Sequence, residues 1–193
     1  VEIPPYIDRM DLSPYLSFLE DPEDRLDFEA VLKKNAAADP GTSGFRPVDG
    51  QTGFGYSSST FWFRFTAENK SADAIEWVLE YPYAAVDYFE LYHPHGSEFG
   101  DIEYQRYMAG DANLFSVRPL SYRTMAIPIT LEPGIHNFYF RIRSKGAVVV
   151  ALNGWGLKAF EHHKSADSAI NWIYYGIMLT ISLFCLLIFI SMK

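Results

Sequence analysis

Arginine and aromatic residues alternate along two predicted strands of this acidic chain. Trp62 and Arg64 lie on one face of the first strand, and Tyr139 and Arg141 lie on one face of the second. A guanidinium group binds carboxylates and hydroxyls in a planar fork, and aromatic rings stack on flat apolar faces such as those of sugars. If the two strands are neighbours, the four side chains form a surface suited to a carbohydrate or a small carboxylate.

A loop rich in arginine supplies further candidates. The segment SVRPLSYR carries Arg118, Tyr122 and Arg123 around a proline, and Asp111 precedes it. An alternative stays open, in which the tryptophan belongs to a second core layer and the arginines pair with surplus acidic residues. The full set of predicted ligand-binding residues is Trp62, Arg64, Asp111, Arg118, Tyr122, Arg123, Tyr139 and Arg141.

Catalytic and metal-binding patterns are weak in comparison. The sequence has no Gly-x-Ser-x-Gly nucleophile elbow and no cysteine–histidine pair outside the apolar segment 168–192. His93-Pro94-His95 is a compact histidine pair, but no partner carboxylate or cysteine is obvious beside it. The acidic run Glu20–Glu29 lacks the oxygen spacing and central glycine of a calcium loop. We therefore expect no enzymatic activity, no cofactor and no metal site in this chain.

Composition excludes other classes of protein. The 193 residues carry 16 Lys plus Arg against 24 Asp plus Glu, a formal charge of -8. An acidic chain does not suit binding to a nucleic-acid backbone, which needs a basic face. The single cysteine, Cys185, cannot form a disulfide within the chain.

The end of the sequence has the composition of a membrane span. No charged residue lies between Asp167 and Lys193, and the segment 168–192 begins with aromatic residues and continues as IMLTISLFCLLIFI. A helix of this length rises about 37 Å, which is enough to cross a hydrocarbon core of about 30 Å. We predict a transmembrane helix at 168–192, preceded by a juxtamembrane linker helix at 158–167.

The remainder, residues 1–157, has the alternation of a β-protein. Seven segments bounded by turn residues alternate apolar and polar side chains or are apolar throughout. Pro128 places its strand at an edge or a bulge. The predicted strands are Tyr15–Leu19, Ser59–Asn69, Ile75–Tyr81, Asp87–His93, Thr124–Leu131, His136–Ser144 and Ala147–Leu152. Their spacing predicts an all-β jelly-roll sandwich.

One short N-terminal helix is expected within EDPEDRLDFEAVLKK. Asp21 would cap it, Pro22 would take its first position, and Lys33 and Lys34 would end it. The following segment, Ala36–Gly55, is rich in Gly, Pro and Ser and is predicted to be a loop.

The order of these segments resembles a known family. The segments that carry the resemblance are FLEDPEDRLDFEAVL, STFWFRFTAEN, VDYFELYHPHG, GDANLFSVRPLSYRTMAIPITLEPG, NGWGLKAFEHH and the aromatic start of the apolar segment. Together they resemble the type 2 extracellular domain, with the first membrane helix, of bacterial seven-transmembrane receptors with diverse intracellular signalling modules. The resemblance implies a periplasmic jelly roll similar to carbohydrate-binding modules, six further membrane helices and a cytoplasmic output domain.

These observations lead to one functional expectation and one alternative. We expect a domain in the periplasm, anchored in the bacterial inner membrane, that binds a small ligand and passes the signal through the membrane helix. The alternative is a protein–protein interaction or dimerisation module without a small ligand. The expected partners are a sugar or a carboxylate and the membrane, with a second copy or a partner receptor in the alternative, and no nucleic acid.

Overall fold

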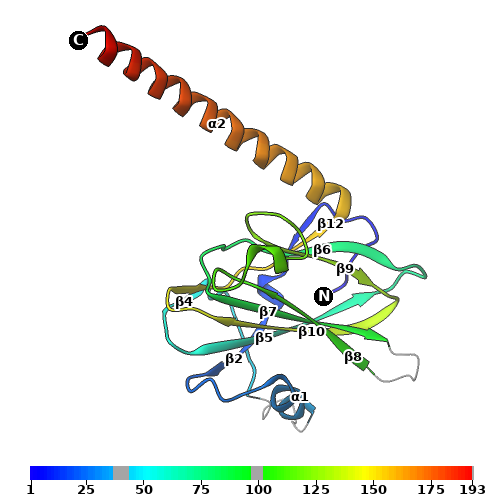
Figure 1. Ribbon diagram of the computed structural model, residues 1–193. Coiled ribbons are helices and arrows are strands. Elements are labelled where there is room, and N and C mark those ends of the chain that lie inside the picture. Colours follow the sequence, from blue (N-terminus) through cyan, green and yellow to red (C-terminus); the bar gives the residue numbers. More distant parts are fainter. Residues whose placement is uncertain (37–43, 97–101, 193) are drawn as a thin grey trace. The chain divides into compact units, whose positions relative to one another are not determined.

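The computed structural model describes residues 1–36, 44–96 and 102–192 (Figure 1). The chain divides into two compact units, Val1–Leu157 and Lys158–Lys193. The first unit is a β-sandwich, as the strand pattern predicted. Residues 37–43 of the loop expected over Ala36–Gly55 lie outside the described residues.

The larger layer of the sandwich is a six-stranded antiparallel sheet in the order β3-β2-β5-β10-β7-β8. Its centre is the long pair β5 and β10, in which Trp62 lies opposite Arg141 and Arg64 lies opposite Tyr139. The two arginine-bearing strands are therefore neighbours. The bounds are β2 Ser17–Asp21, β3 Arg46–Pro47, β5 Thr60–Asn69, β7 Tyr88–Gly96, β8 Ile102–Ala109 and β10 Gly134–Arg143.

The second layer is a four-stranded antiparallel sheet in the order β1-β12-β6-β9, and a small pair of strands, β4 and β11, completes the fold. Chain segments cross repeatedly between the two layers, which is the connectivity of a jelly roll. The bounds are β1 Arg9–Asp11, β4 Gly53–Tyr56, β6 Ile75–Tyr81, β9 Met125–Leu131, β11 Ala147–Val149 and β12 Asn153–Gly156, with short 3-10 helices at Ser13–Tyr15 and Phe115–Val117.

The main core fills the space between the two sheets. Every second residue of β5 and β10 points into it, and the rings of Phe63 and Phe140 stack with centroids 4.7 Å apart. Phe65 and Phe138 stack in the same way, and Trp77 of β6 meets Phe138 edge-on. Alternation with a period of two thus fixes which face of β5 is buried between the sheets and which faces outward.

Seven predicted strands are present with small shifts of their ends, and the predicted edge position of Pro128 is confirmed in β9. Residues 46–47 and 53–56 of the expected loop form β3 and β4, so the loop prediction is wrong there. Three further strands were missed: β1 has only three residues, β8 is largely exposed, and β12 contains two glycines. Gly154 is needed because a Cβ there would lie 2.9 Å from the Trp77 ring.

The predicted short helix is α1, Phe28–Ala36, and it starts later than expected. Its first turn is capped by Asp27, whose carboxylate accepts the Ala30 N–H at 2.8 Å. The Asp21 carboxylate instead accepts the N–H groups of Arg25 and Leu26. Asp24 has a left-handed φ of 53°, which interrupts any helix across this turn.

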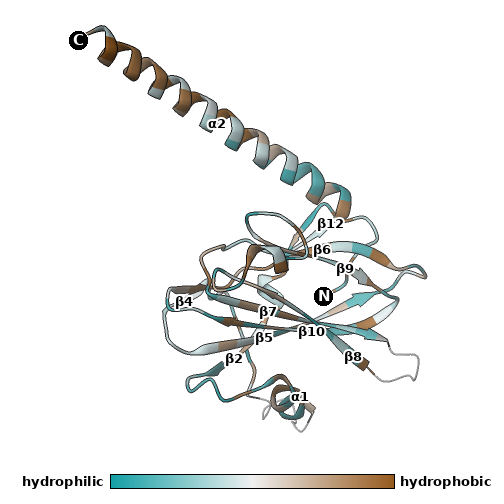
Figure 2. Ribbon diagram, in the orientation of Figure 1, coloured by the Kyte–Doolittle hydropathy of each residue, from teal (hydrophilic) through white to brown (hydrophobic). Residues whose placement is uncertain are grey.

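The second unit is dominated by the helix α2, Leu157–Ser191. By length and composition it could cross a membrane, since a window of 18 residues has a mean hydropathy of 2.4. Figure 2 shows the change along α2 from hydrophilic residues near its start to hydrophobic residues over the rest. The expected linker and span therefore form one continuous helix.

Candidate functional site

The predicted arginine and aromatic surface exists on the outer face of the six-stranded sheet. Trp62 and Tyr139 point away from the main core and belong to a second buried cluster with Val31, Phe45 and Tyr92. Trp62 is 0% exposed and Tyr139 is 2% exposed. The guanidinium of Arg141 lies 5.5 Å from the Trp62 ring. The structure therefore brings four of the eight predicted residues together, but this face is covered.

The cover is α1, which lies along the outer side of this sheet (Figure 1). Phe28 of α1 stacks on Tyr92, with centroids 3.9 Å apart and planes 9° apart, and lies 6.4 Å from the Trp62 ring. It also meets Tyr104 and Tyr139 edge-on. As the alternative reading of the sequence held, Trp62 lies in a second core layer. Contact between Trp62 and a ligand stays a prediction that requires α1 to move.

The last turn of α1 is tied to the sheet by a polar contact. Asn35 donates a hydrogen bond to the Tyr139 hydroxyl at 2.7 Å and accepts one from Arg64. The Arg64 guanidinium lies 4.7 Å from the Phe45 ring. Arg64, Asn35 and Tyr139 line a cavity of about 330 Å³ at this end of the helix. Burial raises the pKa of the Tyr139 hydroxyl, so it stays neutral and can donate or accept a hydrogen bond.

The turn before α1 is held by an ion-pair cluster centred on Asp24. Its carboxylate contacts Arg141 and lies 2.8 Å from Arg143, and the Thr60 hydroxyl donates to it at 2.7 Å. Burial alone would raise the pKa of Asp24, but the Thr60 hydrogen bond and the two arginines together lower it below its ordinary value. The carboxylate is therefore charged at neutral pH, and it fixes the turn against β5 and β10.

The other four predicted residues lie in the loop between β8 and β9. The Arg118 side chain is only 9% exposed; it donates to the carbonyls of Tyr122 and Arg123 at 3.3 Å and lies 3.7 Å from the Asp111 carboxylate. Its guanidinium also covers the Phe115 ring at 4.8 Å. These contacts show that Arg118 holds the loop together. The loop residues are not brought to the surface that carries Trp62, and their role in ligand binding stays a prediction.

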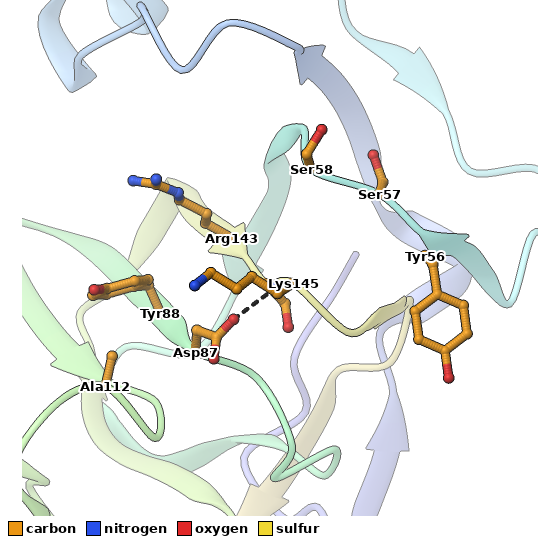
Figure 3. Close-up of a pocket in the computed structure, with 9 residues that line it drawn as sticks. Tyr56, Ser57, Ser58, Asp87, Tyr88, Ala112, Arg143 and Lys145 are labelled. Carbon is orange, nitrogen blue, oxygen red and sulfur yellow. Dashed lines mark hydrogen bonds between the residues drawn. The ribbon is translucent and has the colours of Figure 1, made fainter.

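A large cavity opens at one end of the sandwich, and we call it the end cavity. It has a volume of about 680 Å³ and is lined by Tyr56, Ser57, Ser58, Asp87, Tyr88, Ala112, Arg143, Ser144 and Lys145. In Figure 3 the Lys145 side chain extends toward Tyr88 and Arg143, whereas Tyr56 points away from them. Tyr88 is 43% exposed, and the Arg143 guanidinium lies 5.7 Å from its ring.

Hydrogen bonds to Asp87 connect the chain segments that form the wall of the end cavity. The Asp87 carboxylate accepts the Lys145 N–H at 2.7 Å, the dashed line in Figure 3. The Asp87 carbonyl accepts the Ala112 N–H at 3.0 Å. Gly110 has a φ of +106°, and a Cβ at this position would lie 2.4 Å from the same carbonyl oxygen. The Gly110-Asp111 pair of the sequence therefore closes a tight turn against this wall.

The end cavity contains residues that the sequence reasoning missed. Arg143 was seen to share a face with Tyr139 and Arg141 but was not chosen, and Asp87, Tyr88 and Lys145 were not considered. All four lie at strand ends: Asp87 directly precedes β7 and Tyr88 begins it, whereas Arg143 ends β10 and Lys145 lies two residues beyond it. A polar or charged residue at the end of a predicted strand was the available signal.

The histidine pair noted in the sequence lines a separate cavity of about 560 Å³ with His136, Gln105 and Tyr107. No group of three side chains in the described part of the chain is arranged to hold a metal ion. His93 is buried and stacks on Phe138 at 5.3 Å. Burial, with the nearby His136 and His95, lowers the pKa of His93 to about 4, so its imidazole is neutral at pH 7.

Comparison with solved structures gives a distant match. A structure described as concerning the promiscuous specificity of carbohydrate-binding modules from the β-sandwich superfamily aligns with 11% sequence identity and a TM-score of 0.28. The alignment covers 51% of this chain and 41% of that one, and a similarity this low carries no functional argument. A search of curated proteins found no significant match.

Comparison with protein families gives a match over most of the chain. The family described as 7TMR-DISM extracellular 2 matches residues 13–156, which is nearly all of the sandwich unit. This agrees with the resemblance that the ordered segments gave, and with a long apolar helix directly after the domain. The chain belongs to the 7TMR-DISM extracellular 2 family and is an extracellular domain of a membrane receptor followed by one helix of membrane-spanning length.

Proposed function

We propose that this chain is the ligand-sensing part of its receptor and that the end cavity is its binding site. One observation carries the proposal: a cavity of about 680 Å³ in which Arg143, Lys145 and the exposed ring of Tyr88 converge. Cavities of this size are typical of small-molecule sites, where an apolar wall and a few placed polar groups fix the ligand. The hydrogen bonds that the Asp87 carboxylate and carbonyl accept preorganise this wall.

The ligand we propose is a carbohydrate or a small carboxylate. The guanidinium of Arg143 and the ammonium of Lys145 suit a carboxylate, and the Tyr88 ring offers a face for a sugar ring. The hydroxyls of Ser57 and Ser58 can donate hydrogen bonds to ligand hydroxyls or accept them, and the Asp87 carboxylate can accept them.

Signal transfer is the second part of the proposal. The sandwich would lie in the periplasm of a bacterium, α2 would cross the inner membrane, and a cytoplasmic domain of the receptor would give the output. A ligand can shift such a receptor only by binding one of two conformations more tightly than the other. The binding site must therefore contact an element that can change position.

Titration calorimetry and thermal-shift assays on the fragment Val1–Asp167 test ligand binding. Both buried clusters lie within this fragment, so we expect it to fold alone. The panel contains neutral sugars, sugar acids and di- and tricarboxylates. We expect at least one class to bind, and Lys145→Ala to weaken that binding. The control Lys70→Ala removes an exposed lysine that pairs with Glu2 and should leave binding unchanged. Absence of binding by every compound in the panel would contradict the proposal.

A second candidate function rests on an exposed apolar loop. Leu114, Phe115 and Val117 are 76%, 55% and 45% exposed, which is unusual for three apolar residues so close together. These residues could contact a second copy or a partner receptor, which corresponds to the interaction or dimerisation module given as the alternative in the sequence-based prediction. Light scattering on the same fragment distinguishes the two cases, because a dimer that Leu114→Ser and Phe115→Ser together abolish would favour the interaction module.

A further inference from the structure

One arginine belongs to two sites at once. Arg143 lines the end cavity, and its Nη1 also lies 2.8 Å from the Asp24 carboxylate, on the turn that precedes α1. The Arg143 side chain is 52% exposed and the Asp24 side chain 26% exposed. A guanidinium has five N–H donors in a planar fork, so Arg143 can donate hydrogen bonds to Asp24 or to a ligand in the end cavity. An anion in the end cavity would meet Asp24 as a competitor.

The end cavity has a second positive charge to hold such an anion. Lys145 is exposed, and no hydrogen bond or ion pair of its ammonium group is present among the described residues. The nearest carboxylate of the cavity wall, Asp87, accepts the backbone N–H of Lys145. Arg143 pairs with Asp24, so Lys145 is the cation of the cavity whose ammonium group is left to attract an anion.

The turn at Asp24 depends on this ion-pair cluster. Asp24 has a φ of 53°, a region that costs free energy for a residue other than glycine and persists where surrounding contacts over-determine it. Its contacts are Thr60, Arg141 and Arg143. Phe28, the first residue of α1, follows four positions later, so a change in the turn acts directly on the start of the helix.

We propose that the end cavity binds a small organic anion through Arg143 and Lys145, and that the anion competes with Asp24 for Arg143 and so loosens α1 from the sheet. This inference rests on the proposed function and adds the charge of the ligand and the first movement that follows binding. The movement would expose the aromatic surface around Trp62, which carries the residues that the sequence singled out.

The coupling is reciprocal, so it can be measured from either end. If the anion weakens the hold of Asp24, then removal of the Asp24 charge must strengthen anion binding by the same factor. A partly exposed ion pair corresponds to a factor of about two to five in an equilibrium constant. The same factor is expected in the opening equilibrium of α1 when the anion is bound.

The experiment uses glucuronate as the anion and glucose as its uncharged counterpart, with the fragment Val1–Asp167. Calorimetry measures binding to the wild type, Asp24→Asn, Arg143→Gln and the control Glu23→Gln. Glu23 forms an exposed pair with Arg25 beside the same turn, so its variant removes an equal charge without touching Arg143. Hydrogen–deuterium exchange measures the opening of α1 in each protein, with and without glucuronate.

We expect glucuronate to bind the wild type, to bind Asp24→Asn about two- to five-fold more tightly, and to lose binding in Arg143→Gln. Glucose should bind more weakly than glucuronate, and Glu23→Gln should behave as the wild type. Glucuronate should speed the exchange of α1 in the wild type, and Asp24→Asn should show faster exchange without ligand.

Two results would overturn the inference. If glucuronate binds neither the wild type nor Asp24→Asn, the end cavity is not an anion site. Binding of a neutral sugar in that case would still support the proposed function. If glucuronate binds but Asp24→Asn does not strengthen the binding, and exchange in α1 is unchanged, the anion site stands and its coupling to α1 is refuted.

Discussion

Replacement of Phe28 by Ala tests whether α1 is a local cover rather than part of the sandwich core. Phe28 is half-buried, stacks on Tyr92 at 3.9 Å and meets Trp62, Tyr104 and Tyr139. Loss of its buried area costs roughly 1–2 kcal/mol, and loss of the ring pairs costs roughly 0.5–1.5 kcal/mol more. A total of about 1.5–3.5 kcal/mol corresponds to a roughly 10- to 300-fold change in an opening equilibrium.

Hydrogen–deuterium exchange resolved by segment provides the assay, because it reports local opening and global unfolding separately. We expect Phe28→Ala to speed exchange in α1 by roughly this factor while protection in β5 and β10 stays close to that of the wild type. Phe54→Ala is the matched control: Phe54 is also half-buried, but it stacks on Phe61 at 4.3 Å at the edge of the main core. It should lower protection throughout the sandwich. Equal loss of protection in α1 and in β5 after Phe28→Ala would refute the local-cover reasoning.

Three further predictions concern the scaffold of the site. Glu80 is buried and accepts hydrogen bonds from Thr124 at 2.8 Å and Trp155 at 2.7 Å, so Glu80→Ala should lower the free energy of unfolding in urea by about 2–4 kcal/mol, and Glu80→Gln by less; an unchanged midpoint would contradict this. Gly110→Ala should displace the turn from the Asp87 carbonyl, lower the Tm and weaken ligand binding in calorimetry, and a variant with wild-type Tm would show that the turn is not needed. His93 has its pKa lowered to about 4 by burial, whereas the imidazole titrates near 6.5 in the unfolded chain. The unfolded state therefore binds more protons between these values, and stability should fall as pH drops from about 6.5 to about 4. His93→Gln should remove that part of the pH dependence of unfolding, and an unchanged slope would contradict the assignment.

The alternation of apolar and polar residues predicted the β-sandwich because each face of a strand has a different environment. Phe61, Phe63 and Phe65 face the main core as predicted, and Trp62 and Arg64 face the other side. Strands without this contrast were missed. In β8 the residues are largely exposed. In β12 a glycine is needed at Gly154 because the Trp77 ring lies close to its backbone, and no local pattern in the sequence reveals this contact.

The candidate site was harder to predict because it depends on contacts between distant segments. The sequence predicted one surface from Trp62, Arg64, Tyr139 and Arg141 on the condition that their strands are neighbours, and the structure meets that condition. The sequence could not show that α1 covers this surface. Asp24 and Arg141 are 117 positions apart, and their pairing follows from the path of the chain before α1. The end cavity likewise gathers the ends of strands that no single motif connects.

The most direct test of the central claim is to map where a ligand binds. Amide spectra of the nitrogen-15-labelled fragment Val1–Asp167 would be recorded during titration with glucuronate, citrate and glucose in turn. Saturable shifts at Ser57, Ser58, Asp87, Tyr88 and Lys145 are the predicted result, with smaller shifts spreading to the turn at Asp24 and into α1. Shifts confined to the cavity around His93, or to the loop at Leu114–Val117, would contradict the assignment of the end cavity as the sensing site.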